Sequence, residues 1–211
     1  MSAGWAGKDD SVTKSTIRTA TTGLLLLVAT ACSVSPGSPG PASSGGAPAS
    51  PSSTGPKVPQ VSNPLDATKY EQDPCSVLTE AQAGGVFGAV RKREAGGTVA
   101  PLCTWNDRDN SGISVGFLPR QGGLATTYEN SVNAGAGYFE AAPEVAGYPA
   151  AFSAVHDDRK TGGCQIAVGV TNDEVFTVSS LLRQSSPHYN DPCALVTKVA
   201  EAAVTTLKAG A

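Results

Sequence analysis

The two histidines, His156 and His188, are the side chains best suited to shuttle a proton in a Ser–His–Asp type of hydrolase. His156 precedes the polar run Asp157–Lys160, which is typical of a turn at the end of a strand. His188 lies in a short polar segment just before the last predicted helix. We interpret both as non-catalytic and predict no enzymatic activity. An envelope hydrolase that uses His156 or His188 is the alternative.

Four cysteines could form either disulfides or a metal site: Cys75, Cys103, Cys164 and Cys193. An even number in an exported domain favours two disulfides, although four cysteines allow three connectivities. Intervals of 28 and 29 residues favour Cys75–Cys103 with Cys164–Cys193, but chain entropy alone does not exclude longer loops. The spacings are too wide for a typical zinc site, and Asp107–Asn110 lacks the spacing of a calcium loop. We predict no metal and no cofactor.

Aromatic side chains also gather outside the clearest strands, and such side chains can line a groove for an apolar or glycan ligand. They are Tyr128, Tyr138, Phe139, Tyr148 and Tyr189. Packing of loops onto the core is the interpretation we prefer for them. The sequence therefore leaves the ligand-binding residues unassigned.

Two helices would position these residues, and each is predicted by a repeated Asp-Pro-Cys. Asp is a good helix N-cap and Pro is favoured at the first helical position, so Asp73-Pro74 and Asp191-Pro192 predict helix starts. The first helix would bury Val77, Leu78 and Ala81 and stop at Gly84-Gly85. The second would run nearly to residue 211, with a helical spacing of its apolar residues. These are Leu195, Val196, Val199, Ala203 and Leu207.

Between the two helices the apolar residues alternate, as in half-buried strands. This period occurs at Ile113, Val115 and Phe117 and again at Ile166, Val168 and Val170. Hairpin turns are predicted over residues 106–112 and 171–173. A short helix is predicted over 124–132, and the predicted core aromatics are Trp105, Phe117, Phe152 and Phe176. The pattern predicts an α+β domain: a mostly antiparallel sheet with N- and C-terminal helices packed on one face and two disulfides.

The front of the chain has the features of an export signal. A basic head and the short apolar run 24–31 predict a signal peptide over 1–31, with translation starting at Met1 or at Val12. Cys32 follows Ala29-Thr30-Ala31, which resembles a bacterial lipobox in which the cysteine is lipidated, for example with palmitate. Cleavage after Ala31 without lipidation is the alternative.

A tether is predicted over 32–62 because 21 of the 30 residues from Ser33 to Ser62 are Ser, Pro or Gly. The globular domain is predicted over 63–211. It carries 11 basic and 16 acidic residues, and its one basic cluster, Arg91-Lys92-Arg93, reads as a solvated strand or loop. Because no basic stripe with interleaved aromatics occurs, we do not expect nucleic acid as a partner.

The order of these motifs resembles the DUF3558 family of actinobacterial lipoproteins. The residues that carry the resemblance are the lipobox, the tether, the two Asp-Pro-Cys segments, Cys103-Thr104-Trp105, Val145–Ala150 and Gly163–Val168. The extracellular sensor domains of some mycobacterial Ser/Thr kinases are a more distant resemblance. The family has no assigned activity, so the resemblance implies location and fold without a mechanism.

From these observations we predict a cell-surface lipoprotein, held to the extracytoplasmic face of the membrane by lipid on Cys32. We expect its domain to be a non-catalytic binding or accessory module for an envelope component, a small ligand or a partner protein. A structural surface protein without a specific ligand is a further alternative.

Overall fold

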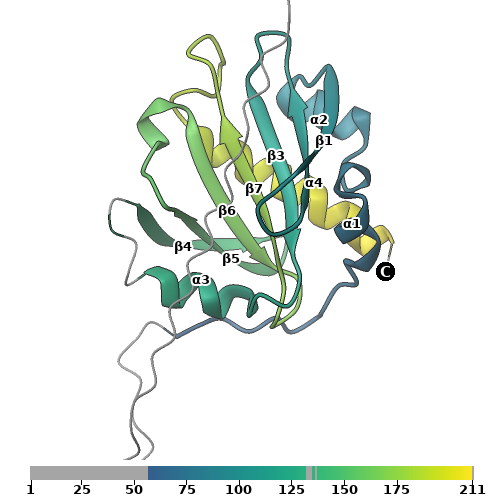
Figure 1. Cartoon of the computed structure of the whole chain (residues 1–211), viewed down its shortest axis with the longest axis vertical. Coiled ribbons are helices and arrows are strands. Elements are labelled where there is room, and N and C mark those ends of the chain that lie inside the picture. The colour runs from purple at the N-terminus through teal and green to yellow at the C-terminus, as the bar shows by residue number, and fades with distance from the viewer. Residues whose placement is uncertain (1–56, 132–134, 136, 211) are drawn as a thin grey trace, which may run out of the picture. The chain divides into compact units, whose positions relative to one another are not determined.

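The computed structural model describes residues 57–131, 135 and 137–210 (Figure 1). The predicted signal peptide, Cys32 and the tether as far as residue 56 lie outside the described residues. The described residues fall within one compact unit, Ser52–Ala211. Among them, no helix has both the length and the apolar character that a membrane span requires.

A seven-stranded antiparallel sheet forms the centre of the domain, with the strand order β1-β2-β3-β7-β6-β5-β4. The sequence-based prediction of a mostly antiparallel sheet is therefore confirmed. The turns predicted at 106–112 and 171–173 join β2 to β3 and β6 to β7. The strands are β1 (Arg91–Gly96), β2 (Pro101–Asn106), β3 (Gly112–Leu118), β4 (Tyr138–Val145), β5 (Tyr148–Ala154), β6 (Gly163–Gly169) and β7 (Val175–Leu181).

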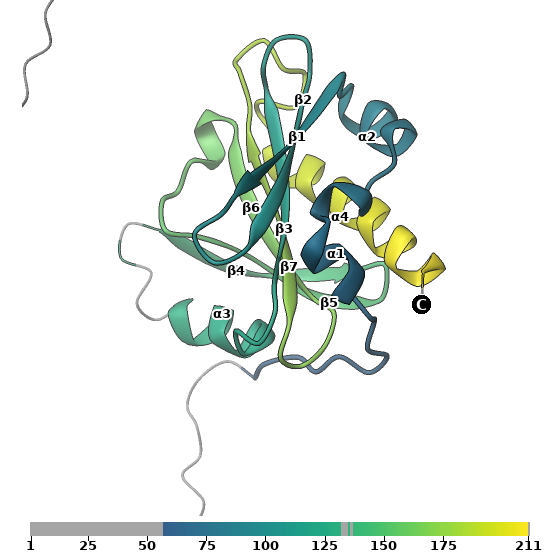
Figure 2. The same cartoon turned by 45° about the vertical axis from the view of Figure 1, so that its right-hand side comes forward.

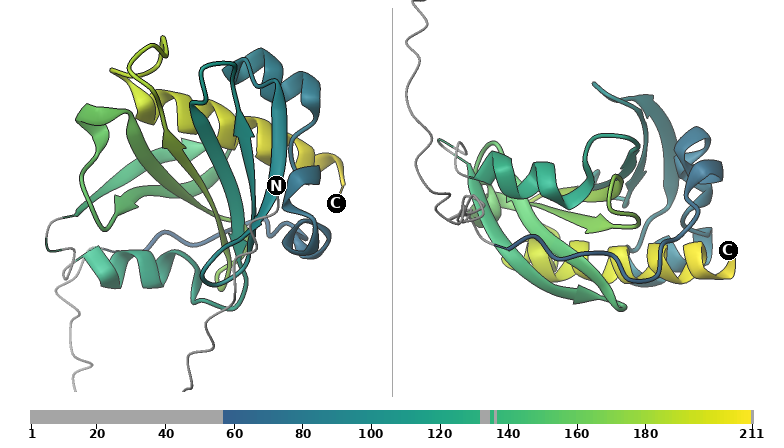
Figure 3. Two further views of the ribbon diagram at one scale, coloured as in Figure 1. Left: turned by 45° about the horizontal axis from the view of Figure 1, so that its top comes forward. Right: turned by 90° about the horizontal axis from the view of Figure 1, so that it is seen from below.

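The alternation of side chains gives the sheet two chemically different faces. Ile166 lies beside Val178 on the face that α4 covers, and both are fully buried in the main core. Gln165 and Thr177 point the other way, toward α3, and are only half-buried. We call these the α4 face and the α3 face. The sheet curls so that the α3 face is the concave one (Figure 3).

The helix α4 (Pro192–Ala209) packs along the convex face, as its spacing predicts. The carboxylate of Asp191 accepts a hydrogen bond from the backbone N–H of Ala194 at 3.2 Å and caps the helix. All five apolar residues predicted to face the core are at most 2% exposed: Leu195, Val196, Val199, Ala203 and Leu207. Their burial fixes α4 on the sheet.

The first Asp-Pro-Cys behaves differently from the second, and the predicted helix start at Asp73 is wrong. Pro74–Ser76 forms only one 3-10 turn, η1, and α1 (Thr68–Gln72) precedes it. Asp73 makes no side-chain cap there, whereas Asp191 does at α4. Without that cap and with no continuing hydrogen-bond ladder, the turn ends at Val77.

A separate helix, α2 (Glu80–Phe87), begins after the turn because Thr79 and Gln82 form a capping box. The helix passes through Gly84-Gly85, where an end was predicted, and stops at Gly88. Gly88 takes a left-handed φ of 74°, which glycine adopts without steric cost. Figure 2 shows α1 and α2 beside α4 on one side of the sheet.

Both disulfides fasten helical segments to the α4 face, in the pairing that the spacing favours. Cys75–Cys103 joins η1 to β2, and Cys164–Cys193 joins β6 to the first turn of α4. Because Cys103 and Cys164 point inward from their strands, each bridge closes over the main core.

The remaining helix, α3 (Gly123–Ser131), lies on the concave face, opposite α4 (Figures 1 and 3). The prediction of a short helix over 124–132 is confirmed for its described residues. The helical layer is therefore two-sided: N- and C-terminal segments cover one face, and α3 covers part of the other. This second layer encloses a pocket.

Candidate functional site

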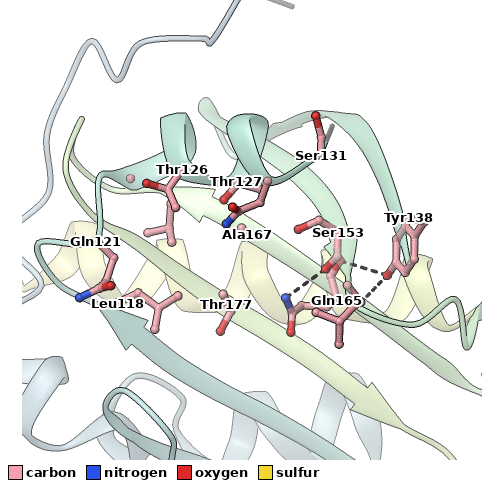
Figure 4. Close-up of a pocket in the computed structure, with 15 residues that line it drawn as sticks. Leu118, Gln121, Thr126, Thr127, Ser131, Tyr138, Ser153, Gln165, Ala167 and Thr177 are labelled. Atoms are coloured by element: carbon pink, nitrogen blue, oxygen red, sulfur yellow. Dashed lines mark hydrogen bonds between the residues drawn. The ribbon is translucent and has the colours of Figure 1, made fainter. Parts of the chain in front are cut away.

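A pocket of about 510 Å³ lies between α3 and the concave face of the sheet (Figure 4). Its lining residues come from α3, from β3 to β7 and from the loops next to these elements. Most of them carry a hydroxyl or an amide. The hydroxyl group is on Thr126, Thr127, Ser131, Tyr138, Ser153 and Thr177, and the amide is on Gln121, Asn130 and Gln165. The apolar part comprises Leu118, Gly123, Ala154, Val155, Ala167 and Val175.

The pocket exists because α3 rests on the sheet along one side of the helix, while the adjacent side stands clear of the sheet. Leu124 and Tyr128 are the buried large side chains of α3, at 3% and 6% exposure. They pack on a small cluster of sheet residues, Ala151, Ala167 and Val175. Two of these three are alanines, so the helix comes close to the sheet there, while the polar side of α3 stands over the hollow.

Two further contacts hold the start of α3. Gly123 has a φ of +58°, and a Cβ there would lie 2.3 Å from the carbonyl oxygen of Asn172, so only glycine fits. The side-chain oxygen of Asn172 accepts a hydrogen bond from the backbone N–H of Val61 at 2.9 Å. Val58 packs against the cluster under α3. The segment that leads into the domain thus braces the helix that covers the pocket.

The described lining residues include no charged side chain. The guanidinium of Arg159 lies 4.1 Å from the centre of the Tyr138 ring and is paired with Asp157 at 2.7 Å and Glu140 at 3.3 Å. The hydrogen bond from Arg159 lowers the pKa of Asp157 to about 2, and the same bond raises the pKa of Arg159. Both groups keep their charge outside the pocket.

Tyr138 and Gln165 bridge a split in the sheet at one end of the pocket (Figure 4). The pairing of β5 with β6 stops at Phe152 and Ile166, so Gln165, which still pairs with Ser179 of β7, has no backbone partner on β5. The Tyr138 hydroxyl accepts from the Gln165 N–H at 2.9 Å and donates to its C=O at 3.4 Å. The Gln165 side chain donates to the carbonyl of Ser153 at 3.0 Å. Side chains thus replace the missing ladder bonds.

The hydroxyl of Tyr138 can keep this role because it stays protonated. Burial raises the pKa of Tyr138 above its ordinary value, although the hydrogen bond with the Gln165 backbone opposes the rise. A neutral phenol both donates and accepts, which the two backbone groups of Gln165 require.

A smaller pocket of about 160 Å³ lies on the other side of this bridge and shares Tyr138, Ala154 and Gln165 with the first. His156 lines it, together with Asp158, Ser179 and Ser180. The described hydrogen bonds do not join His156 to either serine, and the Ser180 hydroxyl is engaged with the carbonyls of Gly162 and Cys164. The second predicted histidine, His188, lies elsewhere, in the turn before α4.

Two other motifs have structural roles. Gly112–Gly116 has the form Gly-x-Ser-x-Gly, but Ser114 lies in the middle of β3 and its hydroxyl bonds that of Thr104 at 2.9 Å. A nucleophile elbow needs a sharp strand-to-helix turn instead.

Asp107 accepts a hydrogen bond from the N–H of Ser111 at 2.8 Å within the β2–β3 turn. Within the part of the chain that the structure describes, no three His, Cys, Asp or Glu side chains could hold a metal ion.

One buried carboxyl escaped the sequence analysis. Glu174 in the β6–β7 turn is 9% exposed, and its Oε1 has no hydrogen-bond partner among the described residues. Burial raises the pKa of Glu174 to about 7, and the nearby carboxylates of Glu71 and Asp66 add to the rise. Glu174 lines neither of these two pockets.

The pocket residues were also missed, apart from Tyr138. The signal was present in β6 and β7, where Gln165, Thr177 and Ser179 alternate with buried apolar residues. Polar residues on the outward side of a strand normally face water, so the pattern alone did not distinguish a ligand site from a solvated face.

Residues 27–206 match the model of a family described as a protein of unknown function, DUF3558. Neither the curated proteins nor the solved structures contain a significant match to the chain. The match covers most of the chain and includes both disulfides and the whole sheet. The chain therefore belongs to the DUF3558 family.

Proposed function

We propose that the domain is a non-catalytic binding module and that the pocket under α3 is its ligand site. The observation that carries the proposal is the pocket itself. Its volume of about 510 Å³ lies within the range of roughly 300–1,000 Å³ usual for small-molecule sites. Hydroxyl and amide groups converge on it from α3 and from the sheet, and such groups orient a ligand.

The ligand that suits this site is small and uncharged. A charged group moved from water into a partly enclosed pocket needs a counter-charge, and the described lining offers none. Polar but neutral lining groups instead favour a ligand that exchanges hydrogen bonds with water for hydrogen bonds with protein.

Native mass spectrometry of the full chain purified from its own cells tests this proposal. Thr127→Trp would obstruct the pocket, whereas Glu129→Trp places an indole at an exposed position of α3 outside the lining. We expect a bound small molecule in the wild type and in Glu129→Trp, and its loss in Thr127→Trp. An unliganded wild type, or equal binding in both variants, would remove the pocket as the site.

We further propose that the protein is a cell-surface lipoprotein anchored through Cys32, with a Ser/Pro/Gly-rich tether from residue 32 to residue 56. The last residues predicted for the tether, 57–62, instead pack on the domain through Val58 and Val61. A short apolar run directly before a cysteine supports lipidation, and the tether would let the domain reach its ligand away from the bilayer. Labelling with palmitate tests this: the wild type should incorporate the label and Cys32→Ser should not. Equal labelling of both would place the lipid elsewhere.

A hydrolase is the second candidate, because the smaller pocket gathers His156 with Asp158 and two serines. His156→Ala tests it with a small ester such as p-nitrophenyl acetate. Turnover by the wild type that is lost in His156→Ala would support the hydrolase; no turnover above buffer would remove it. A structural surface protein without a ligand is the outcome if neither pocket binds anything.

A further inference from the structure

The lining of the α3 pocket also indicates the class of ligand, on the premise that this pocket is the binding site. Its two sides differ. The α3 side presents Thr126, Thr127 and Asn130, whereas the sheet side presents an apolar patch of Leu118, Ala167 and Val175 beside the polar side chains of Ser153, Gln165 and Thr177. A fitting ligand therefore has hydrogen-bonding groups along one edge and an apolar surface on another.

The polar groups on α3 are available to a ligand. Thr126, Thr127 and Asn130 make no side-chain hydrogen bond among those that the structure describes, while the Ser131 hydroxyl donates to the carbonyl of Tyr128. Groups that are wet in the empty pocket lose water when a ligand enters, so each needs a partner on the ligand. A purely apolar ligand supplies none, and its entry would leave these groups unpaired.

The apolar patch on the sheet side limits the ligand in the opposite way. Leu118, Ala167 and Val175 offer only van der Waals contact, and burial of an apolar ligand surface against them is favourable. A ligand with polar groups all round would lose hydrogen bonds to water there without replacing them.

We propose that the α3 pocket binds a neutral saccharide. A sugar ring carries hydroxyl groups around its edge and apolar C–H groups on its face, and it has no charge unless it bears an acid or amine. These three properties match, in turn, the hydroxyl and amide groups of the lining, the apolar patch of Leu118, Ala167 and Val175, and the absence of charge among the described lining residues. The cavity has room for more than one ring, and the bridge of Tyr138 and Gln165 closes its far end.

The test is a titration of the full chain by isothermal calorimetry with maltose and cellobiose, compared with glucuronic acid and glucosamine. The neutral disaccharides should bind at least about tenfold more tightly than the charged sugars, because the described lining offers no counter-charge. A neutral apolar dye, N-phenyl-1-naphthylamine, is the probe for the competing ligand class.

The double variant Thr126→Val with Thr127→Val sharpens the test because Val keeps the shape of Thr and removes its hydroxyl. Loss of two hydrogen bonds should weaken disaccharide binding about tenfold or more. The same change should leave binding of the dye equal or tighter. Circular dichroism of the double variant checks that it is folded.

Four results overturn the inference. Tighter binding of a charged sugar, or disaccharide binding that the double variant does not weaken, excludes the proposed recognition. Binding of the dye alone, blocked by Thr127→Trp but not by Glu129→Trp, leaves the pocket as the ligand site and excludes saccharides. If no probe binds and native mass spectrometry finds no ligand, the proposed function fails as well.

Discussion

Substitution of Tyr138 by Phe tests the role of its hydroxyl in holding the split sheet together. The change keeps the ring beneath Arg159 and removes both hydrogen bonds to the Gln165 backbone. An unpaired buried N–H or C=O costs about 1–3 kcal/mol. Because Gln165 is only half-buried and water can reach it through the pocket, we expect the free energy of unfolding to fall by about 1–2 kcal/mol.

Urea denaturation followed by the fluorescence of the buried Trp105 measures this loss. With a slope of about 1–3 kcal/mol per molar urea, the midpoint should fall by roughly 0.5–1 M. Tyr148→Phe is the matched control: Tyr148 is 5% exposed, and its hydroxyl has no hydrogen bond among the described residues. Its stability should change by less than about 0.5 kcal/mol.

Exchange of the Gln165 amide proton provides a local readout of the same bridge. It should accelerate in Tyr138→Phe and remain unchanged in Tyr148→Phe. If Tyr138→Phe costs no more than Tyr148→Phe and the amide exchanges as slowly as before, the bridge does not hold the split, and our account of this end of the pocket is wrong.

Three further predictions concern stability. The pKa of Glu174 is raised from 4.5 to about 7, so its contribution to stability is lost as the pH rises through that interval. In Glu174→Gln the urea midpoint should therefore decline less as the pH rises, and this variant should be more stable than the wild type above pH 7. A pH profile of the urea midpoint equal to that of the wild type would contradict this prediction. Removing Cys75–Cys103 or Cys164–Cys193 by paired Ala substitutions should cost about 3–4 kcal/mol each, because the loops are nearly equal in length. A large difference in urea midpoint between the two variants would contradict this and show that packing around each disulfide in the native state, rather than loop length, sets the cost of its removal. Thr79→Ala should lower the free energy of unfolding by about 1 kcal/mol through loss of the α2 cap, measured by chemical denaturation against exposed Thr205→Ala.

Alternation and helical spacing were sufficient to predict the sheet and α4. Ile113, Val115 and Phe117 all face the core, because the period of two places every second side chain on the same face. Asp191 likewise predicted the start of α4, because it caps the helix at that point. The apolar residues that follow keep the helical spacing as far as Leu207, so the length of the helix was predicted as well. Local pattern and tertiary packing agree in these elements.

The first Asp-Pro-Cys shows where local pattern is insufficient. Asp73 and Asp191 precede the same Pro-Cys pair, but only Asp191 caps a helix. At η1 the chain must bring Cys75 to Cys103 and bury Val77 and Leu78 over the sheet, and the capping box at Thr79 then starts a new helix. Tertiary contacts outweigh a cap worth about 1 kcal/mol.

The pocket could not be predicted because it depends on which face α3 covers. Gln165 and Thr177 read as ordinary outward residues of two strands, and Thr126 and Thr127 read as the exposed side of a short helix. Only the placement of Leu124 on the alanines of β5 and β6 brings these polar groups together. The residues that form the site are far apart in the sequence and share no motif.

A crystal structure of the full chain isolated from its own cells tests the central claim most directly. We expect density for an uncharged small molecule beneath α3, within hydrogen-bond distance of Thr126 or Thr127 and in contact with Ala167. A pocket that holds water alone, or a ligand bound beside His156 instead, would contradict the claim.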